Sequence, residues 1–214
     1  MTDQEFMEWY WGDAPEQDKK LHNKMCEFEE YFEDMIFDPG FSSFNLIKCQ
    51  SKLPGSDEWI DDEAPRPEAL EYFSYNMVRT EVKDLENCEG YYDHKNKVLC
   101  LDTKLADDDS SLLHEMIHLH EGVINDLPLY FHDMLYWALY SDLRNKIVGL
   151  DDAISSHAHI LNESTIYSSG GLHDILFLLK SFDLDIRMGY PFGTVFAYGR
   201  VEDFKNLKLK IDTI

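Results

Sequence analysis

The chain of 214 residues lacks the features that mark several common protein classes. No apolar run approaches the ~20 residues that a membrane-spanning helix needs, so we expect no membrane insertion. The first residues show no basic segment followed by an apolar stretch, and we therefore expect no secretory signal and a cytoplasmic location. No Cys-x-x-Cys pair occurs, which argues against a zinc ribbon and against a thioredoxin-type motif.

Positive charge is also scarce. The sequence has 19 Lys and Arg residues against 42 Asp and Glu residues, and its formal net charge is −23. Proteins that bind the phosphate backbone use clustered basic side chains, so we expect no direct binding of nucleic acid. Acidic runs at 61–63, 107–109 and 151–152 are typical of solvated loops and helix starts.

The four cysteines are Cys26, Cys49, Cys88 and Cys100. Their even number permits two disulfides, but the expected reducing compartment favours free, mostly buried thiols.

The length and the composition, with 44% hydrophobic and 29% charged residues, favour a single domain over residues 1–214. Apolar residues at three- and four-residue steps predict a helix over 21–36. A short run at 44–49 favours a strand, and Pro67 opens a second predicted helix that reaches residue 77.

The middle of the chain predicts a hairpin followed by helices. Two β-favouring runs within 91–101 flank a polar segment that suits a turn. The acidic residues at 107–109 and Ser110 then offer helix caps before an apolar helix expected over about 112–122. Further helices are expected over about 131–143 and 172–182, so the predicted fold class is α+β.

The predicted helix over 112–122 contains the motif His114-Glu115-Met116-Ile117-His118, which is an HExxH sequence. Residues four apart share one helical face, so both imidazoles can reach one Zn²⁺ at about 2.0–2.1 Å. Glu115 can reach a water activated by the zinc, and we expect it to act as the general base of amide hydrolysis.

A catalytic zinc site needs a third protein ligand, for which the sequence offers several candidates. His132 is preferred, because it follows His118 by fourteen residues and opens the next predicted helix after a short connection. Glu163, His157 and His159 remain alternatives.

Three other histidines are not expected to bind the metal. His120 lies about 200° around the helix from His118, so we expect it on the surface. His22 and His173 fall in separate helical segments and show no sign of a site.

The segment LLHEMIH at 112–118, the later His132 and the preceding pattern Cys88-x-Gly90 to Val98-x-Cys100-Leu101 resemble the SprT-like zinc metallopeptidase domain over about residues 20–147. His132-Asp133 with a following aromatic pair is similar to the related WLM metallopeptidases. The resemblance implies a zincin-like core with a small sheet, the ligands His114, His118 and His132, and the catalytic Glu115. Residues 148–214 are expected to form an extension of unknown role that packs on this core.

A peptidase of this kind binds a protein or peptide substrate, and zincin folds bind it as an added strand at a sheet edge. We expect that edge at Val98–Leu101. Four tyrosines are candidates to donate a hydrogen bond to the oxyanion: Tyr91, Tyr92, Tyr130 and Tyr136.

Two non-enzymatic functions remain open. The acidic surface can occupy a basic partner, for example as a mimic of DNA. A zinc-stabilised pseudoenzyme would keep the metal ligands without cleaving a substrate.

Overall fold

The computed structural model describes residues 5, 8–10, 12, 14–32, 47–52, 59–64, 78–125, 129–160, 173–196 and 201–210. Its architecture is α+β, as the sequence predicts. The helices are α2 (Glu16–Glu27), α5 (Asp109–Asn125), α6 (Leu129–Lys146), α7 (Leu150–Ile160) and α8 (Ile175–Met188). The strands are β1 (Ile47–Lys52), β2 (Trp59–Ala64), β3 (Arg79–Lys83), β4 (Gly90–Asp93), β5 (Val98–Asp102), β6 (Ile147–Val148) and β7 (Lys208–Leu209).

The sheet next to α5 has three strands in the order β3-β5-β4. Strands β4 and β5 pair antiparallel and confirm the predicted hairpin, whereas β3 pairs parallel to β5. The expected edge at Val98–Leu101 was wrong, because these residues form the central strand and all of them are buried. Among the described strands, β4 lies at the edge on the other side of β5 from β3.

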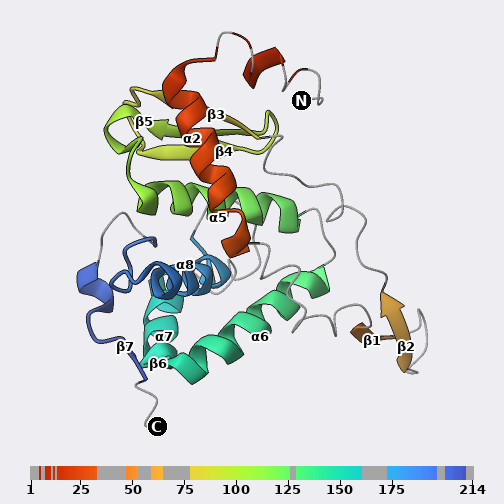
Figure 1. Ribbon diagram of the computed structural model, residues 1–214. Coiled ribbons are helices and arrows are strands. Elements are labelled where there is room, and N and C mark those ends of the chain that lie inside the picture. The colour runs from red at the N-terminus through yellow and green to blue at the C-terminus, as the bar shows by residue number, and fades with distance from the viewer. Residues whose placement is uncertain are drawn as a thin grey trace.

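Helix α5 covers one face of this sheet and packs on β4 and β5 (Figure 1). Register places Gly90 opposite Leu101 and Tyr92 opposite Leu99, so these four residues share a face of the sheet. This face lies toward α5, because a Cβ atom at Gly90 would meet Glu115 of α5, and a Cβ atom at Gly122 of α5 would meet Tyr92. The hairpin and the HExxH helix are therefore directly packed.

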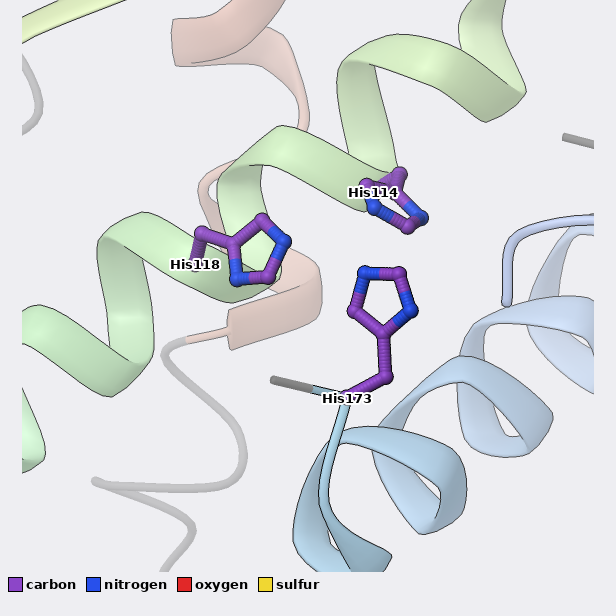
Figure 2. Close-up of side chains that lie close together, drawn as sticks. All are labelled: His114, His118 and His173. Carbon is purple, nitrogen blue, oxygen red and sulfur yellow. The ribbon is translucent and has the colours of Figure 1, made fainter. Parts of the chain in front are cut away.

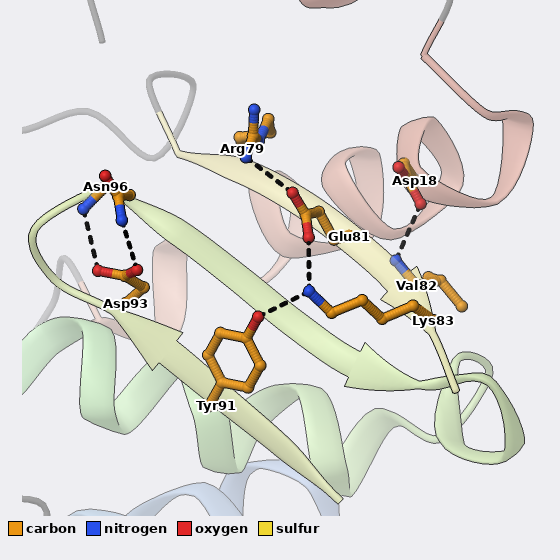
Figure 3. Close-up of polar contacts among 8 residues, drawn as sticks. All are labelled: Asp18, Arg79, Glu81, Val82, Lys83, Tyr91, Asp93 and Asn96. Atoms are coloured by element: carbon orange, nitrogen blue, oxygen red, sulfur yellow. Dashed lines mark hydrogen bonds and ion pairs between the residues drawn. The ribbon is translucent and has the colours of Figure 1, made fainter. Parts of the chain in front are cut away.

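The opposite face of the sheet carries a polar network (Figure 3). Glu81 accepts from Arg79 at 2.7 Å and from Lys83 at 3.0 Å, and Lys83 donates to the hydroxyl of Tyr91 at 2.8 Å. The side chains of Arg79, Glu81 and Lys83 are partly exposed, so this side of the strands is open to solvent, and ion pairs of this kind contribute little to stability.

Helix α2 lies along the free side of β3. The carboxylate of Asp18 accepts from the backbone N–H of Val82 at 2.9 Å, and the Asp18 carbonyl accepts from Thr80 Oγ1 at 2.6 Å (Figure 3). Lys24 pairs with Asp109 and so joins α2 to the first turn of α5. These contacts give a partner to a strand edge that would otherwise be exposed.

Helix α8 lies on the side of α5 away from the sheet, and α6 packs against α8 (Figure 1). One hydrophobic cluster contains residues from α2, β5, α5 and α8, among them Met25, Leu99, Met116 and Phe182. It also contains Val195 and Phe204, so residues after 147 belong to the same core as the predicted metallopeptidase segment.

The boundaries differ from the sequence expectations at several places. Helix α2 ends at Glu27 within the helix expected to reach residue 36; helical backbone returns over 30–32, and residues 33–36 lie outside the described residues. The strand expected at 44–49 is described from Ile47 onward. The last helix runs over Ile175–Met188 instead of 172–182. Strand β3 and helix α7 were not predicted, and the helix expected at 67–77 lies outside the described residues.

Within the described part of the chain, none of the helices has both the length and the apolar character needed to cross a bilayer. Cys26, Cys88 and Cys100 are free thiols, as expected, but only Cys100 is buried, whereas Cys26 is half-buried and Cys88 is exposed. The side chain of Cys49 lies outside the described residues.

Candidate metal centre

The HExxH motif lies in the middle of α5, and so on a helix as predicted. The helix begins at Asp109, just after Asp108, whose carboxylate accepts from the backbone N–H of Ser111 at 2.8 Å. This is the capping interaction that the acidic run before the motif predicts. His114 and His118 follow with four-residue spacing, and their ring centroids lie 5.1 Å apart.

A third imidazole comes from His173, which immediately precedes α8. Asp174 is the N-cap of that helix, and its carboxylate accepts from the N–H of Phe177 at 2.8 Å. The cap fixes where α8 begins and so fixes the position of His173 in front of its first turn. The packing of α8 against α5 then carries this ring to the motif.

The three rings point toward a common centre (Figure 2). One ligand atom from each of His114, His118 and His173 lies within 4.8 Å of the others. Nitrogens that bind one tetrahedral Zn²⁺ are about 3.4 Å apart, so the three rings would move closer together to hold such an ion. Among the described residues, these three histidines form the group that can hold a metal ion.

His114 is 2% exposed, and its Nδ1 lies 2.8 Å from the carbonyl oxygen of Val195. A carbonyl only accepts, so Nδ1 carries the proton and Nε2 is the nitrogen with a lone pair. Burial, together with the neighbouring His173 and His118, lowers the pKa of His114 to about 3. The imidazole is therefore neutral at pH 7, as a metal ligand must be.

His118 has a carboxylate partner, because its Nδ1 lies 3.2 Å from Glu121 Oε2. Burial lowers the pKa of His118, but the hydrogen bond to Glu121 and the charges of Glu115, Glu121 and Asp174 raise it above its ordinary value overall. A carboxylate on the second nitrogen orients a metal-binding imidazole and increases its basicity.

His173 is held through its backbone. Nε2 of His157, on α7, lies 2.9 Å from the carbonyl oxygen of His173. Burial and the neighbouring His118 and His157 lower the pKa of the His173 imidazole to about 4, so this ring is also neutral at pH 7. His157 was one of the alternative ligands, but in the structure its ring contacts the backbone of His173, which is itself a candidate ligand.

Two phenylalanines form an apolar wall beside the three imidazoles. The ring of Phe177 lies 4.9, 4.7 and 4.5 Å from those of His114, His118 and His173. Phe196 lies 5.5 Å from His173 and 6.0 Å from Phe177. Such a wall keeps the surroundings of the imidazoles apolar, which strengthens electrostatic interactions inside the site.

Glu115 is 1% exposed and lies between α5 and the edge strand β4. A Cβ atom at Gly90 would stand 2.6 Å from its Oε1, so the carboxylate lies against the backbone of β4. The charge of Glu115 also raises the pKa of His118. The carboxylate is thus close to both the strand edge and a candidate metal ligand.

Three other predicted ligands have side chains that the structure does not describe. His132 lies within α6, but its side chain is outside the described residues, and so are the side chains of His159 and Glu163. Their ligand assignments stay predictions. The view that His173 shows no sign of a site was wrong, because its imidazole joins those of the HExxH pair.

The expected surface position of His120 was also wrong, since this residue is 3% exposed. Its ring lies 5.7 Å from that of Phe32, and burial together with the charge of Lys180 lowers its pKa to about 3. Helix α5 is covered by the sheet on one side and by α8 and α2 on others, so the face opposite His114 and His118 is buried too.

The candidate oxyanion tyrosines are dispersed. Tyr91 accepts from Lys83 on the face of the sheet away from α5. Tyr92 packs near Gly122, and Tyr136 stacks on Tyr140 with ring centroids 5.9 Å apart. The side chain of Tyr130 lies outside the described residues.

A local signal for His173 does exist in the sequence. His173-Asp174 precedes an apolar segment, and Asp is a preferred N-cap, so the pattern predicts a histidine at the start of a helix. The pattern does not indicate which other helix lies next to this helix start.

No protein-family model, curated protein or solved structure matches this chain.

Proposed function

We propose that this protein is a zinc-dependent metallopeptidase with a zincin-like active site. The single observation that carries the proposal is the convergence of the imidazoles of His114, His118 and His173 around one centre. The SprT-like resemblance supports the same activity, with His173 in the position of the third ligand in place of His132.

The donor set suits zinc. Three imidazoles leave one open coordination position, which is the arrangement of a catalytic zinc site. In two of the three, the second ring nitrogen is engaged by a carbonyl or a carboxylate, as metal-binding histidines require. When bound, zinc supplies a Lewis acid that polarises the scissile carbonyl and lowers the pKa of water to about 7.

Glu115 supplies the proton chemistry in this proposal. Its carboxylate accepts the proton of the attacking water and returns it to the amine that leaves, so the proton balance closes within one residue. Its close approach to the backbone of β4 positions the carboxylate, and a general base must lie within hydrogen-bond reach of the proton it removes.

The edge strand β4 offers a place for the substrate backbone. It is paired with β5 on one side only among the described strands, and it lies against the helix that carries Glu115. An extended peptide that adds to β4 through main-chain hydrogen bonds would bring its carbonyl groups alongside the HExxH helix. This replaces the expected binding edge at Val98–Leu101, which is the central strand.

The test begins with the metal content of the purified protein, for which we expect close to one zinc per chain. His114→Ala should lose the zinc, whereas Glu115→Gln should retain it and lose the cleavage of an unfolded protein such as casein. A Glu115→Gln variant that cleaves at the wild-type rate would refute the assigned base. A wild-type protein without zinc would refute the site.

The non-enzymatic alternative is a zinc-stabilised protein that uses its acidic surface to bind a basic partner. The near-complete burial of Glu115 favours this alternative, because a catalytic carboxylate must meet water and substrate. The same variant distinguishes the two functions, since partner binding should tolerate Glu115→Gln but weaken when acidic clusters such as 107–109 are neutralised.

A further inference from the structure

The turn over residues 190–196 carries the carbonyl group that orients His114. This turn follows α8 and belongs to the C-terminal third of the chain, for which the sequence indicates no role. We propose that Asp185 is a positioning residue of the metal centre, which acts on His114 through this turn. The inference rests on the metal site of the proposed function, and it does not require peptidase activity.

Asp185 lies in the last turn of α8 and is 0% exposed. Its two carboxylate oxygens accept from two backbone groups of the turn. Oδ2 accepts from the N–H of Gly193 at 2.7 Å, and Oδ1 accepts from the N–H of Val195 at 3.0 Å. Its own carbonyl accepts from the N–H of Tyr190 at 2.8 Å, so the start of the turn is tied to the same residue.

Val195 connects the carboxylate to the metal ligand. Its N–H donates to Asp185, and its carbonyl oxygen accepts from Nδ1 of His114 at 2.8 Å. Val195 is itself fully buried, so neither backbone group can exchange its partner for bulk water. The position of Asp185 therefore determines where the acceptor for His114 lies.

The shape of the turn explains why a side chain is needed to hold it. Gly193 has a φ of +90°, a region that few residues other than glycine adopt. The remaining closure comes from Thr194, whose N–H and hydroxyl donate to the carbonyl of Pro191 at 3.2 and 2.6 Å. Without Asp185, the buried N–H groups of Gly193 and Val195 lose their acceptors, and the turn has to rearrange to satisfy them.

Asp185→Asn is the sharpest substitution, because it conserves volume and removes one acceptor. The amide nitrogen of Asn would face either Gly193 N–H or Val195 N–H, and two donors repel. We expect the zinc affinity of the folded protein, measured by competition with a chelator, to fall about 10- to 100-fold. The absorption bands of the Co²⁺-substituted variant should shift as well, which a change in global stability alone would not cause.

Ser181→Ala is the matched control. Ser181 is buried on the same helix, and its hydroxyl donates to the carbonyl of Leu178 at 2.7 Å, away from the turn. This variant should lose some stability and keep the wild-type zinc affinity and Co²⁺ spectrum. An Asp185→Asn protein that folds and binds zinc within twofold of wild type would overturn the proposal, and so would an equal loss in both variants.

A second variant covers the case in which Asp185→Asn does not fold. Thr194→Ala removes an exposed hydrogen bond of the same turn and leaves Asp185 in place. We expect a several-fold loss of zinc affinity, and an unchanged affinity would overturn the role of the turn. Zinc binding without peptide cleavage would refute only the peptidase function and would leave this inference intact.

Discussion

The backbone of Gly90 lies so close to Glu115 that a Cβ atom on this glycine would stand 2.6 Å from Oε1 and 2.9 Å from Cγ of the carboxylate side chain. The two residues come from the edge strand β4 and the HExxH helix α5, so the contact fixes the distance between strand and helix at the proposed general base. The absence of a side chain at position 90 is what lets the carboxylate occupy this space.

Gly90→Ala should therefore displace the carboxylate of Glu115. We expect kcat/KM for peptide cleavage to fall about tenfold to a hundredfold, because small displacements of a reacting group are costly. The zinc content should not change, since the three atoms nearest to a Cβ at position 90 all belong to Glu115.

Gly122→Ala provides the control for this substitution. Its Cβ atom would meet Nδ1 of His94 at 2.7 Å, and His94 is an exposed side chain that can move. Activity near that of wild type is expected for Gly122→Ala. Equal activity of Gly90→Ala and wild type, measured on the same peptide, would contradict the role assigned to the contact.

The third ligand can be identified by a pair of substitutions. His173→Ala removes one of the three converging imidazoles, so the purified variant should contain far less than one zinc per chain. His132→Ala should retain zinc, because the site is already complete with His173. Metal analysis by mass spectrometry checks both variants, and the reverse result would restore the ligand that the motif spacing predicts.

The carboxylate of Glu121 should tune the zinc affinity through His118. Glu121→Ala leaves Nδ1 of His118 without the acceptor at 3.2 Å, and we expect the affinity to fall about 10- to 100-fold. Glu121→Gln keeps an oxygen acceptor and should show a smaller loss. Glu202→Ala, at an exposed glutamate that pairs with Lys205, should bind zinc like wild type in the same chelator competition.

The buried His120 predicts a loss of stability in acid. Its pKa is about 3 in the folded protein and about 6.5 in the unfolded chain, so below pH 6.5 the unfolded chain binds a proton that the folded chain does not. The free energy of unfolding should then fall by about 1.4 kcal/mol for each pH unit that His120 stays neutral, down to about pH 3.

His120→Phe removes this contribution while conserving an aromatic ring next to Phe32. Between pH 7.5 and pH 5, the free energy of unfolding of the variant should fall by about 2 kcal/mol less than that of the wild type. Denaturant titrations with a chelator present measure this difference, and the chelator removes the contribution of metal binding. Parallel pH profiles of the two proteins would contradict the prediction, because they would show that folding does not lower the pKa of His120.

Residue spacing and capping residues predicted the features of the site that depend on neighbours in the sequence. The spacing of His114 and His118 sets both rings on one face of a helix, and the structure confirms the helix and the pairing of the hairpin before it. The acidic cap at Asp108 was likewise readable from the residue types. These features depend on helix geometry and on hydrogen bonds within a few residues.

The rest of the site depends on contacts between distant segments. His173 reaches the motif because α8 packs against α5, and periodicity within either helix does not contain that packing. His120 was misplaced for the same reason. A polar strip on a helix predicts a face exposed to solvent when other elements cover only one side of that helix, but α5 is covered on several sides. The edge strand was misplaced because β3 pairs with β5 in parallel across a long connection, which no turn signal marks.

The acceptor for His114 is a main-chain carbonyl, that of Val195, and this has a consequence for natural variation. Replacing the valine with another residue leaves the oxygen in place, so position 195 can change its side chain within the limits of core packing. Substitutions at Gly193 and Asp185 should displace this oxygen instead, because these two residues set the path of the chain. Homologous sequences that retain the three imidazoles should therefore vary more freely at 195 than at 193 or 185.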